Sequence, residues 1–534
     1  MQGKSDPGRH LLDAGALCGD LVDKGTIYAF LADHRAELFK DEDFADLFPS
    51  GRGRPSTPVE LICSVMVLQA LEGLSDRDAL RQLRNRIDWK VACGLALDDP
   101  GFDFTNLTYW RGRLRASARP ERIFDAVRAV VDATGVLAKR HRRALDSTIL
   151  DDAVATQDTV TQLISAARRV IASVPAAAQA QLSHDYSLPA KPIIDWSLRE
   201  ERDDLVSALV ADAIALLDAV SGTELNSDQA DAVGMLALVS AQDVEPGEQP
   251  GSWRIARKVA KDRVISTVDP EARHGHKSVS VRKDGFKAHI CIEPATGIVT
   301  AAKVTPANTP DGPVGLELMA QGPQGLEVLA DSAYGSGVTR TELKTMGHHL
   351  VIKPLPSHPA VPGGLGRDDF SVDHKARRVT CPAGHVARLS FSGVAKFAPH
   401  CSSCPLRARC TTAKARTFSV GPNDAELVAA RKSWHGEVAA TYRQHRPMAE
   451  RSISWLVAKG NRRLRYRGVA RNDAWLHLRA AALNLRRLLA LGLAHDGGWV
   501  LASSLWALGS DKKRDVYLAK TNLRGRFSPS ITAL

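Results

Sequence analysis

Two short apolar runs, each carrying an aspartate, constrain the fold of this chain more than any other feature. Asp146 lies within the predicted strand Arg143–Leu150, and Asp331 directly follows the apolar run Leu326–Ala330. A third acid, Glu450, lies among arginines on a predicted helix, where a single carboxylate indicates a functional role. Three such acids would repel one another unless cations neutralised them, and Mg²⁺ is the usual partner of hard oxygen ligands. The sequence therefore predicts a metal-binding triad anchored on buried strands.

The patterns around these acids predict a mixed sheet flanked by helices. The clearest hairpin in the sequence is formed by Gly285–Glu293 and Gly297–Thr305, which flank a turn. Helical periodicity dominates several other stretches. These stretches are 58–72, 75–83, 106–115, 159–238 and 424–493, the last with a Gly/Arg-rich interruption near 460–468. At 534 residues the chain is long enough for three or four units, and acids at strand ends suit a strand-anchored active site.

The charge distribution favours a polyanionic partner. The chain carries a formal net charge of +11, and its sequence pI is about 9.3. Residues 431–534 hold 20 Lys and Arg against 6 Asp and Glu, so the basic excess is concentrated in this segment. Such a segment would follow phosphates and make binding strongly salt-dependent. Any single residue there is better explained as part of an ordinary solvated face.

Membrane and secreted classes are disfavoured. Arg486 and Arg487 interrupt the best apolar stretch, and the N-terminal segment lacks the apolar core of a signal peptide. The eight cysteines are too few and too clustered for a disulfide-dense scaffold. We therefore expect a cytoplasmic protein without a membrane partner.

Four of the cysteines form a second chemical pattern. Cys401 and Cys404 have the spacing of a zinc knuckle, and Cys381 and Cys410 provide two further thiolates. The spacing from Cys404 to Cys410 is longer than usual for a second pair. The sequence leaves open a structural Zn²⁺ site and, equally, four reduced cysteines packed in a small core.

Taken in order, the motifs of the chain resemble those of the DDE transposases of bacterial insertion sequences. The resemblance covers nearly the whole chain. The motifs are Phe104–Arg111, Asp146–Asp152, Asp269–Gly275, Lys287–His289, Val304–Asn308, Leu329–Gly335, the arginine-flanked Glu450, and Asn484–Leu488. Relatives often carry a Tyr-Arg-Glu-Lys pattern on the helix of the glutamate, which Tyr442, Arg446, Glu450 and Lys459 match in type but only partly in spacing. Lys459 lies nine positions beyond Glu450, so its role depends on the helix ending first.

This resemblance implies a ribonuclease-H-like core, an α+β or α/β fold with a mixed sheet flanked by helices. It implies that Asp146, Asp331 and Glu450 are catalytic and hold two Mg²⁺ or Mn²⁺ ions, which cleave DNA and then support strand transfer. The partners implied are terminal inverted repeats and target DNA, bound by a homodimer at the bacterial nucleoid. Six arginines are candidate phosphate contacts. They are Arg446, Arg451, Arg462, Arg463, Arg465 and Arg467.

The resemblance and the local patterns together predict the domain organisation. We expect a helical DNA-binding domain over 1–135 and a catalytic core divided by two insertions. The core occupies 136–158, 266–354 and 424–495; a mainly helical insertion occupies 159–265, a cysteine-bearing insertion 355–423, and a basic tail 496–534.

Other interpretations of the same residues remain open. An Asp after a strand is often a turn residue, and Asp151, Asp152 or Asp158 could rival Asp146 by composition. The polar cluster of Asp269, Arg273, His274 and His276 could line the active site or form a solvated loop. The alternatives to a transposase are a catalytically inactive DNA-binding protein derived from one and a nuclease of the same fold.

Overall fold

The computed structural model describes residues 1–5, 11–189, 191–258, 260–276 and 282–502, and most of the expected basic tail over 496–534 lies outside these residues. Two compact units divide the chain. The first comprises Met1–Arg140, Thr296–Ile298 and Leu478–Leu534, and the second comprises His141–Ala295 and Val299–His477. None of the described helices is long and apolar enough to cross a membrane.

The first unit is mainly helical. Its helices are α1 (Ala14–Cys18), α2 (Ile27–Leu38), α3 (Val59–Glu72), α4 (Asp76–Asn85), α5 (Ile87–Cys93), α6 (Thr105–Ala116) and α7 (Arg122–Ala133), with short 3₁₀ turns at Gly19–Leu21 and Asp41–Leu47. The expected helices at 58–72, 75–83 and 106–115 are confirmed as α3, α4 and α6. Helix α3 is apolar around most of its circumference and forms the centre of this unit, whereas Ser75 caps the strongly amphipathic α4 by accepting from Asp78 N.

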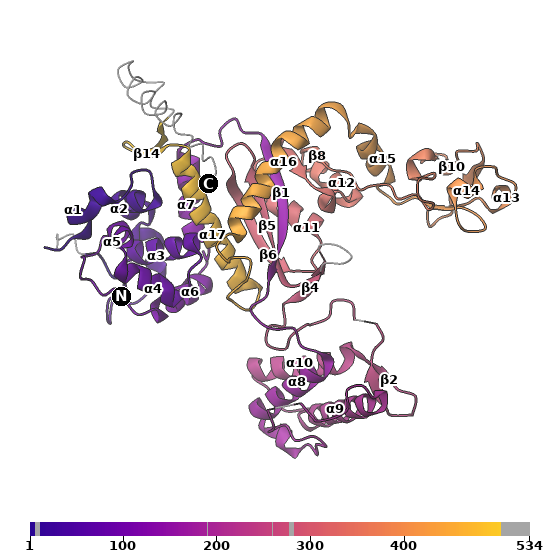
Figure 1. Ribbon diagram of the computed structural model, residues 1–534, viewed down its shortest axis with the longest axis horizontal. Coiled ribbons are helices and arrows are strands. Elements are labelled where there is room, and N and C mark those ends of the chain that lie inside the picture. Colours follow the sequence, from indigo (N-terminus) through magenta and orange to yellow (C-terminus); the bar gives the residue numbers. More distant parts are fainter. Residues whose placement is uncertain (6–10, 190, 259, 277–281, 503–534) are drawn as a thin grey trace, which may run out of the picture. The chain divides into compact units, whose positions relative to one another are not determined.

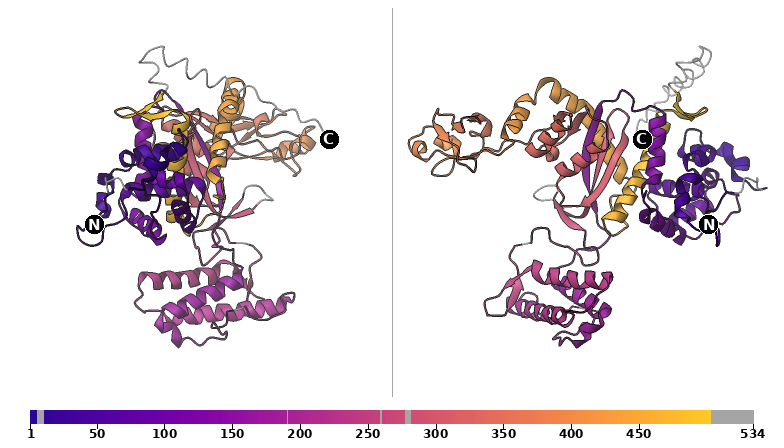
Figure 2. Two further views of the ribbon diagram at one scale, coloured as in Figure 1. Left: turned by 60° about the vertical axis from the view of Figure 1, so that its left-hand side comes forward. Right: turned by 180° about the vertical axis from the view of Figure 1, so that it is seen from behind.

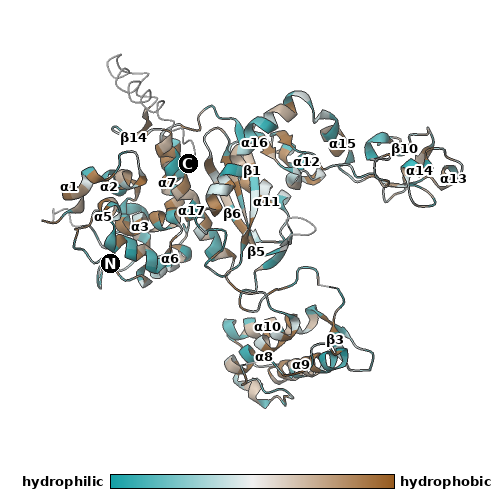
Figure 3. Ribbon diagram, viewed as in Figure 1, coloured by the Kyte–Doolittle hydropathy of each residue, from teal (hydrophilic) through white to brown (hydrophobic). Residues whose placement is uncertain are grey.

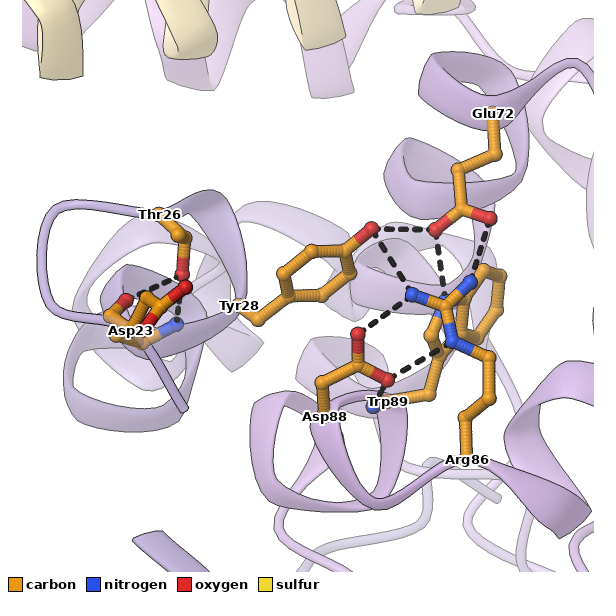
Figure 4. Close-up of polar contacts among 8 residues, drawn as sticks. Asp23, Thr26, Tyr28, Glu72, Arg86, Asp88 and Trp89 are labelled. Carbon is orange, nitrogen blue, oxygen red and sulfur yellow. Dashed lines mark hydrogen bonds and ion pairs between the residues drawn. The ribbon is translucent and has the colours of Figure 1, made fainter. Parts of the chain in front are cut away.

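A polar network fixes three of these helices to one another (Figure 4). Arg86 Nη1 lies 2.7 Å from Glu72 Oε2, and Trp89 Nε1 donates to Glu72 Oε1 at 2.9 Å. Tyr28, on α2, also donates to Glu72, and burial together with this carboxylate raises the pKa of its phenol to about 12. Glu72 therefore serves as the common acceptor for α2, the segment beginning at Arg86, and α5.

The second unit is built on a six-stranded mixed sheet (Figure 1). The strands are β1 (Arg142–Asp151), β4 (Arg273–His276), β5 (Arg282–Glu293), β6 (Ile298–Pro306), β7 (Glu327–Ala330) and β8 (His349–Ile352). Their order is β4-β5-β1-β7-β8, with β6 also paired to β5. β5 is antiparallel to β1, whereas β7 and β8 continue the sheet in parallel. This combination confirms the expected ribonuclease-H-like mixed sheet, and the β5–β6 pair confirms the expected hairpin.

Several helices of the same unit flank this sheet. They are α11 (Asp311–Ala320), α12 (Gly337–Thr345), α15 (Asp424–Ser433), α16 (Gly436–Val457) and the first part of α17 (Val469–Ala490), with a 3₁₀ turn, η4 (Ser332–Tyr334), after β7. Leu145 and Val328 on the strands pack with Val314 and Leu318 of α11 in one buried core.

Residues 159–255 form a mainly helical lobe with its own core (Figure 2). The lobe contains α8 (Thr159–Ser173), α9 (Arg199–Ala219), α10 (Ser227–Gln242) and a small hairpin of β2 (Val244–Pro246) and β3 (Trp253–Ile255). Figure 3 shows hydrophobic and hydrophilic residues mixed along α9, and Val206, Leu209, Val210, Ala213 and Leu216 of this helix are buried in the core of the lobe. Asp158 caps α8 by accepting from Thr161 N at 2.9 Å. The chain enters and leaves through a neck in which Gln157 N donates to Ile265 O at 2.8 Å.

The cysteine-bearing segment is built from very short elements. Its strands are β9 (Ser371–Asp373), β10 (Arg378–Thr380), β11 (Val386–Arg388), β12 (Val394–Lys396) and β13 (Thr417–Ser419), with helices α13 (Ala398–Cys401) and α14 (Arg407–Cys410). Phe370, Phe397 and Phe418 form its apolar core with the cysteines around them. β-strands of only three residues contribute little stability to a sheet by themselves.

Candidate functional site

Strand register brings Asp146 and Asp331 to matching positions on neighbouring strands. Parallel β1 and β7 pair Ala144 with Leu329. Each aspartate lies two residues further along its own chain, so both side chains point to the same face of the sheet. Asp331 directly follows β7 and caps η4, where its Oδ1 accepts from Ala333 N at 3.0 Å. The sheet itself therefore places the first two acids side by side.

Helix α16 supplies a cation to this acid pair. Arg446 Nη2 lies 2.7 Å from Asp146 Oδ1 and 3.8 Å from Asp331 Oδ2. Its Nη1 donates to Leu145 O at 2.7 Å, so the guanidinium is tied to β1 by backbone and side chain together. The Arg446 residue is only 6% exposed. Its fork neutralises two carboxylates in a place where water is largely excluded.

The two aspartates differ in their exposure. The side chain of Asp146 is 10% exposed, whereas that of Asp331 is 41% exposed. Burial raises the pKa of the Asp146 carboxyl, Arg446 opposes this rise, and the charge of Asp331 adds to it. The ionised form of the buried Asp146 therefore depends on a neighbouring cation, whereas Asp331 is open to solvent.

Glu450 lies one helical turn beyond Arg446 and is exposed. Burial raises the pKa of the Tyr442 phenol, and after the opposing effect of Arg446 the charges of all three acids add to the rise. Tyr442 lies one helical turn before Arg446 on α16. In this part of the chain the ligand oxygens of the three acids are not all within 4.8 Å of one another. Asp146 and Asp331 share the Arg446 guanidinium, and Glu450 is an exposed residue one turn further along α16.

The acid pair fits a divalent cation by the chemistry of its donors. Both side chains offer carboxylate oxygens, which are the ligands that Mg²⁺ and Mn²⁺ prefer. The pair already shares one positive group, because the Arg446 guanidinium contacts both acids. Bringing Glu450 inward would complete a set of three carboxylates.

The other candidate arginines divide into two groups. Arg462 is engaged with β1, since its Nη1 lies 3.2 Å from Thr148 Oγ1 and 3.1 Å from Ile149 O. The backbone after α16 also follows the end of β1, where Asp151 N donates to Arg462 O at 2.9 Å. The remaining four are exposed and belong to the same helix or the loop that follows it. They are Arg451, Arg463, Arg465 and Arg467.

Helix α16 ends at Val457, before Lys459. Lys459 itself adopts a left-handed backbone conformation with φ 59°, so an ideal helical wheel does not describe its direction. The nine-residue spacing from Glu450 therefore does not place Lys459 on the opposite side of the helix. Lys459 is exposed.

The rival acids near Asp146 have local partners elsewhere. Asp158 caps α8, and Asp151 Oδ1 lies 2.9 Å from Lys283 Nζ. Asp152 is 8% exposed, and burial raises the pKa of its carboxyl to about 6, with Asp269 and Asp284 adding to the rise. These groups lie at the far end of β1, away from Asp146.

The polar cluster before the hairpin also belongs to that end of the strand. Asp269 is 1% exposed and accepts from Gly468 N at 3.1 Å, just before α17 begins. His274 Nδ1 lies 2.6 Å from Asp284 Oδ1 across the β4–β5 pair. Asp269 and His274 are thus structural partners of neighbouring segments, and they do not contact the acid pair.

The four clustered cysteines line one cavity together with His385 and His400. Those two imidazole rings stack with centroids 4.6 Å apart. Burial raises the pKa of the Cys410 thiol, Arg416 opposes the rise, and the charges of Cys401, Cys381 and Cys404 add to it. The four cysteines are therefore mutual neighbours, although no three of these described sulfurs lie within 4.8 Å of one another. All eight cysteines of the chain are free thiols.

Carboxylates on a ribonuclease-H-like sheet are typical of a class of enzymes that act on nucleic acids. Comparisons with known proteins identify the family within this class. Residues 18–113 match a transposase domain (DUF772), and residues 252–485 match a transposase DDE domain. These two matches identify the chain as a DDE transposase of the insertion-sequence type. The DDE match includes Asp331 and Glu450, whereas Asp146 precedes it on the far side of the helical lobe. Neither a curated protein nor a solved structure gives a match.

Proposed function

We propose that this transposase binds the terminal inverted repeats of its element and catalyses metal-dependent DNA cleavage followed by strand transfer. The observation that carries the proposal is the placement of Asp146 and Asp331 side by side on parallel strands, with Arg446 contacting both. A domain that only binds DNA gains nothing from two neighbouring acids, because carboxylates repel phosphates. The acid pair therefore favours catalysis over simple binding.

Asp146, Asp331 and Glu450 would hold Mg²⁺ or Mn²⁺ at the open side of the pair. Two bound ions would activate a water and stabilise the leaving oxyanion at neutral pH. All three side chains would serve as carboxylate ligands, with Asp146 the most buried of them. Arg446, tied to Leu145 O, would keep Asp146 ionised and oriented while the ligand set changes. In strand transfer the freed 3′ hydroxyl of the element would attack a target phosphodiester, so that a new ester bond forms while the bond to the target's own 3′ oxygen breaks and that oxygen leaves as a 3′ hydroxyl.

The exposed arginines supply the phosphate contacts in this proposal. Arg451, Arg463, Arg465 and Arg467 are accessible and lie on α16 or in the loop after it. Arg446 and Arg462 are already engaged with β1, so we propose that they orient the site and do not track the DNA backbone directly. Guanidinium groups suit this role because they stay charged and bind phosphate in a planar fork.

We also propose a structural Zn²⁺ site formed by Cys381, Cys401, Cys404 and Cys410. Two tight turns support it. Cys381 N donates to His385 O at 2.9 Å, and Cys404 N approaches Cys401 O at 3.5 Å. Tetrahedral Zn–S distances of ~2.3 Å would draw the four sulfurs closer together than they lie in this structure.

The remaining parts of the proposal concern assembly. The N-terminal helical domain over residues 1–135 would bind the repeats, and a homodimer would hold two element ends at the bacterial nucleoid in the cytoplasm. The catalytic core would comprise 136–158, 266–354 and 424–495, interrupted by the helical and cysteine-bearing insertions over 159–265 and 355–423.

The test is a reaction with DNA that carries the element's terminal repeats and a separate target plasmid. The transposase hypothesis predicts, in the presence of Mg²⁺ or Mn²⁺, cleavage at the element ends and covalent joining to the target. Cleavage without joining would indicate a nuclease of the same fold. Specific binding of the ends without cleavage in either metal would indicate an inactive DNA-binding derivative.

A further inference from the structure

The first unit carries an exposed basic loop that the fold itself does not use. Residues 49–55 are all exposed and lie between the 3₁₀ turn Asp41–Leu47 and helix α3. The loop contains Arg52 and Arg54 and no acidic residue. Neither guanidinium forms a hydrogen bond, an ion pair or a ring contact with any residue that the structure describes. Two permanently charged groups therefore project from this surface without a partner in the described part of the chain.

Both ends of this loop are fixed to helix α6. At the first end, the ring of Phe48 lies edge-on to that of the buried Trp110 with centroids 5.3 Å apart. The guanidinium carbon of Arg113 lies 4.9 Å from the centroid of the same Phe48 ring. At the other end, Asn106 donates a hydrogen bond to Thr57 Oγ1. The base of the loop is thus held by one helix, and residues 49–55 extend outward from it.

Two glycines alternate with the arginines of the loop. Gly53 has a φ of 100°, a left-handed conformation that favours glycine. Gly51 lies outside that region, and a Cβ added to it would meet nothing within 4 Å. The fold therefore calls for a glycine at position 53 but not at position 51. Glycine also lets a backbone approach a ligand closely, and this property accounts for Gly51 as well as for Gly53.

The slender backbone and the charge of this loop fit the minor groove of duplex DNA. The minor groove of B-DNA is only about 6 Å wide, so a chain that enters it must have little side-chain bulk. Runs of A·T pairs make the groove narrower and more negative, and arginine inserted there is attracted by that potential. Arginine suits this place better than lysine because its guanidinium is planar and more weakly hydrated. Contacts to phosphates on the outside of the duplex would not require glycines beside the arginines.

We propose that Arg52 and Arg54 enter the minor groove of A·T-rich duplex DNA and give the protein a preference for A·T pairs at that place. In the minor groove A·T pairs present only hydrogen-bond acceptors, whereas G·C pairs add the N2 amino group of guanine, a donor that a guanidinium cannot bind. The inference rests on the DNA binding proposed for residues 1–135. It adds which groove this region reads and which base pairs it prefers.

The experiment measures binding of the full-length protein to three short duplexes by fluorescence anisotropy, without added Mg²⁺ or Mn²⁺. The duplexes share their flanks and differ in a central block of A·T, G·C or inosine·cytosine pairs. Inosine lacks the N2 amino group of guanine, so the third duplex has the minor-groove pattern of A·T and the major-groove pattern of G·C. We expect the A·T and inosine·cytosine duplexes to bind about 10-fold more tightly than the G·C duplex.

Substitutions in the loop test whether it causes this preference. Arg52→Ala with Arg54→Ala should remove the preference, and the thermal midpoint should stay that of the wild type because both side chains are exposed. Gly51→Ala should weaken binding of the A·T duplex, although the added methyl group meets nothing in the folded protein. Lys24→Ala with Arg119→Ala is the matched control. It removes two exposed charges from the same unit and should keep the preference.

Several outcomes would overturn the inference. Equal affinity of the wild type for the A·T and G·C duplexes would do so, and so would inosine·cytosine bound like G·C, because that result places recognition in the major groove. A preference that survives the loss of Arg52 and Arg54 would assign it to another part of the chain. An equal loss of affinity for all three duplexes in that variant would leave the loop as a phosphate contact only. If the wild type binds none of the duplexes at low salt, the DNA binding proposed for this region fails, and the inference fails with it.

Discussion

The sheet that carries Asp146 and the segment that carries the clustered cysteines hold their polar groups by different means. β1 pairs with β5 over eight consecutive residues, from Ala144 to Asp151, so backbone register fixes the acid before any ligand binds. The cysteine segment has strands of three residues each around a core of three phenylalanines. Its thiols surround one cavity without reaching the spacing of a bound metal. A long register can set a site by itself, whereas short elements need a ligand to do so.

The largest effect should come from removing a charge at the acid site. Asp146→Asn, Asp331→Asn or Glu450→Gln should each reduce cleavage of element-end DNA to background and leave binding largely intact, because each change removes a metal-ligating charge at nearly constant shape. Gel-based cleavage and fluorescence anisotropy measure the two properties. Asp151→Asn is the matched control, since its side chain lies on the same strand and pairs with Lys283. Wild-type cleavage by any of the three variants would remove that residue from the site.

Metal removal should lower the stability of the cysteine segment but not that of the sheet. If zinc binds, chelation or Cys401→Ser with Cys404→Ser should cost the segment on the order of several kcal/mol of local stability and open 355–423 to proteolysis. Cleavage would fall only indirectly. Cys18→Ser, outside the cluster, is the control. Elemental analysis of protein purified without a metal-binding tag decides the matter, and less than about a tenth of an equivalent of zinc with four titratable thiols would leave ordinary reduced cysteines.

The loop beside β1 should show a smaller, graded effect on DNA affinity. Replacing Arg463, Arg465 and Arg467 with alanine should reduce the slope of log affinity against log salt by about 0.9 for each lost phosphate contact. Arg462→Ala is a sharp comparison, because its side chain already bonds to Thr148 and Ile149. We expect it to lower thermal stability and leave the slope unchanged. An unchanged slope in the triple variant would assign these arginines to the solvated surface.

The smallest effect concerns Asp152, whose pKa is raised to about 6 by burial and by the neighbouring acids. A carboxyl with a raised folded pKa stabilises the protein fully below the unfolded value near 3.8, and this contribution is lost as the pH rises through 6. Asp152→Asn should therefore raise the stability of the sheet at pH 7 to 8 by on the order of 1–2 kcal/mol, with little change at pH 4. Thermal unfolding at the two pH values provides the measurement. Destabilisation at pH 8 would contradict the assigned cause.

Sequence patterns predicted the helices and strands well, because these elements depend on residues that are close to one another in the sequence. The apolar runs around Asp146 and before Asp331 are strands, and the hairpin and the N-terminal helices lie where periodicity placed them. The interactions of Arg446 and Arg462 with β1 could not be inferred from sequence, since they join segments about three hundred residues apart.

The neck of the helical lobe has a consequence for how the chain folds. β1 and β5 pair residue 151 with residue 285, so an unfolded intervening chain would have to close a long loop before the sheet could form. The lobe, however, has its own core, and its two ends meet where Gln157 bonds to Ile265. Once α8, α9 and α10 have packed, the chain that the sheet must close shrinks to the stretches 151–157 and 265–285 on the two sides of the neck. We therefore expect early folding of this lobe to accelerate the pairing on which Asp146 depends.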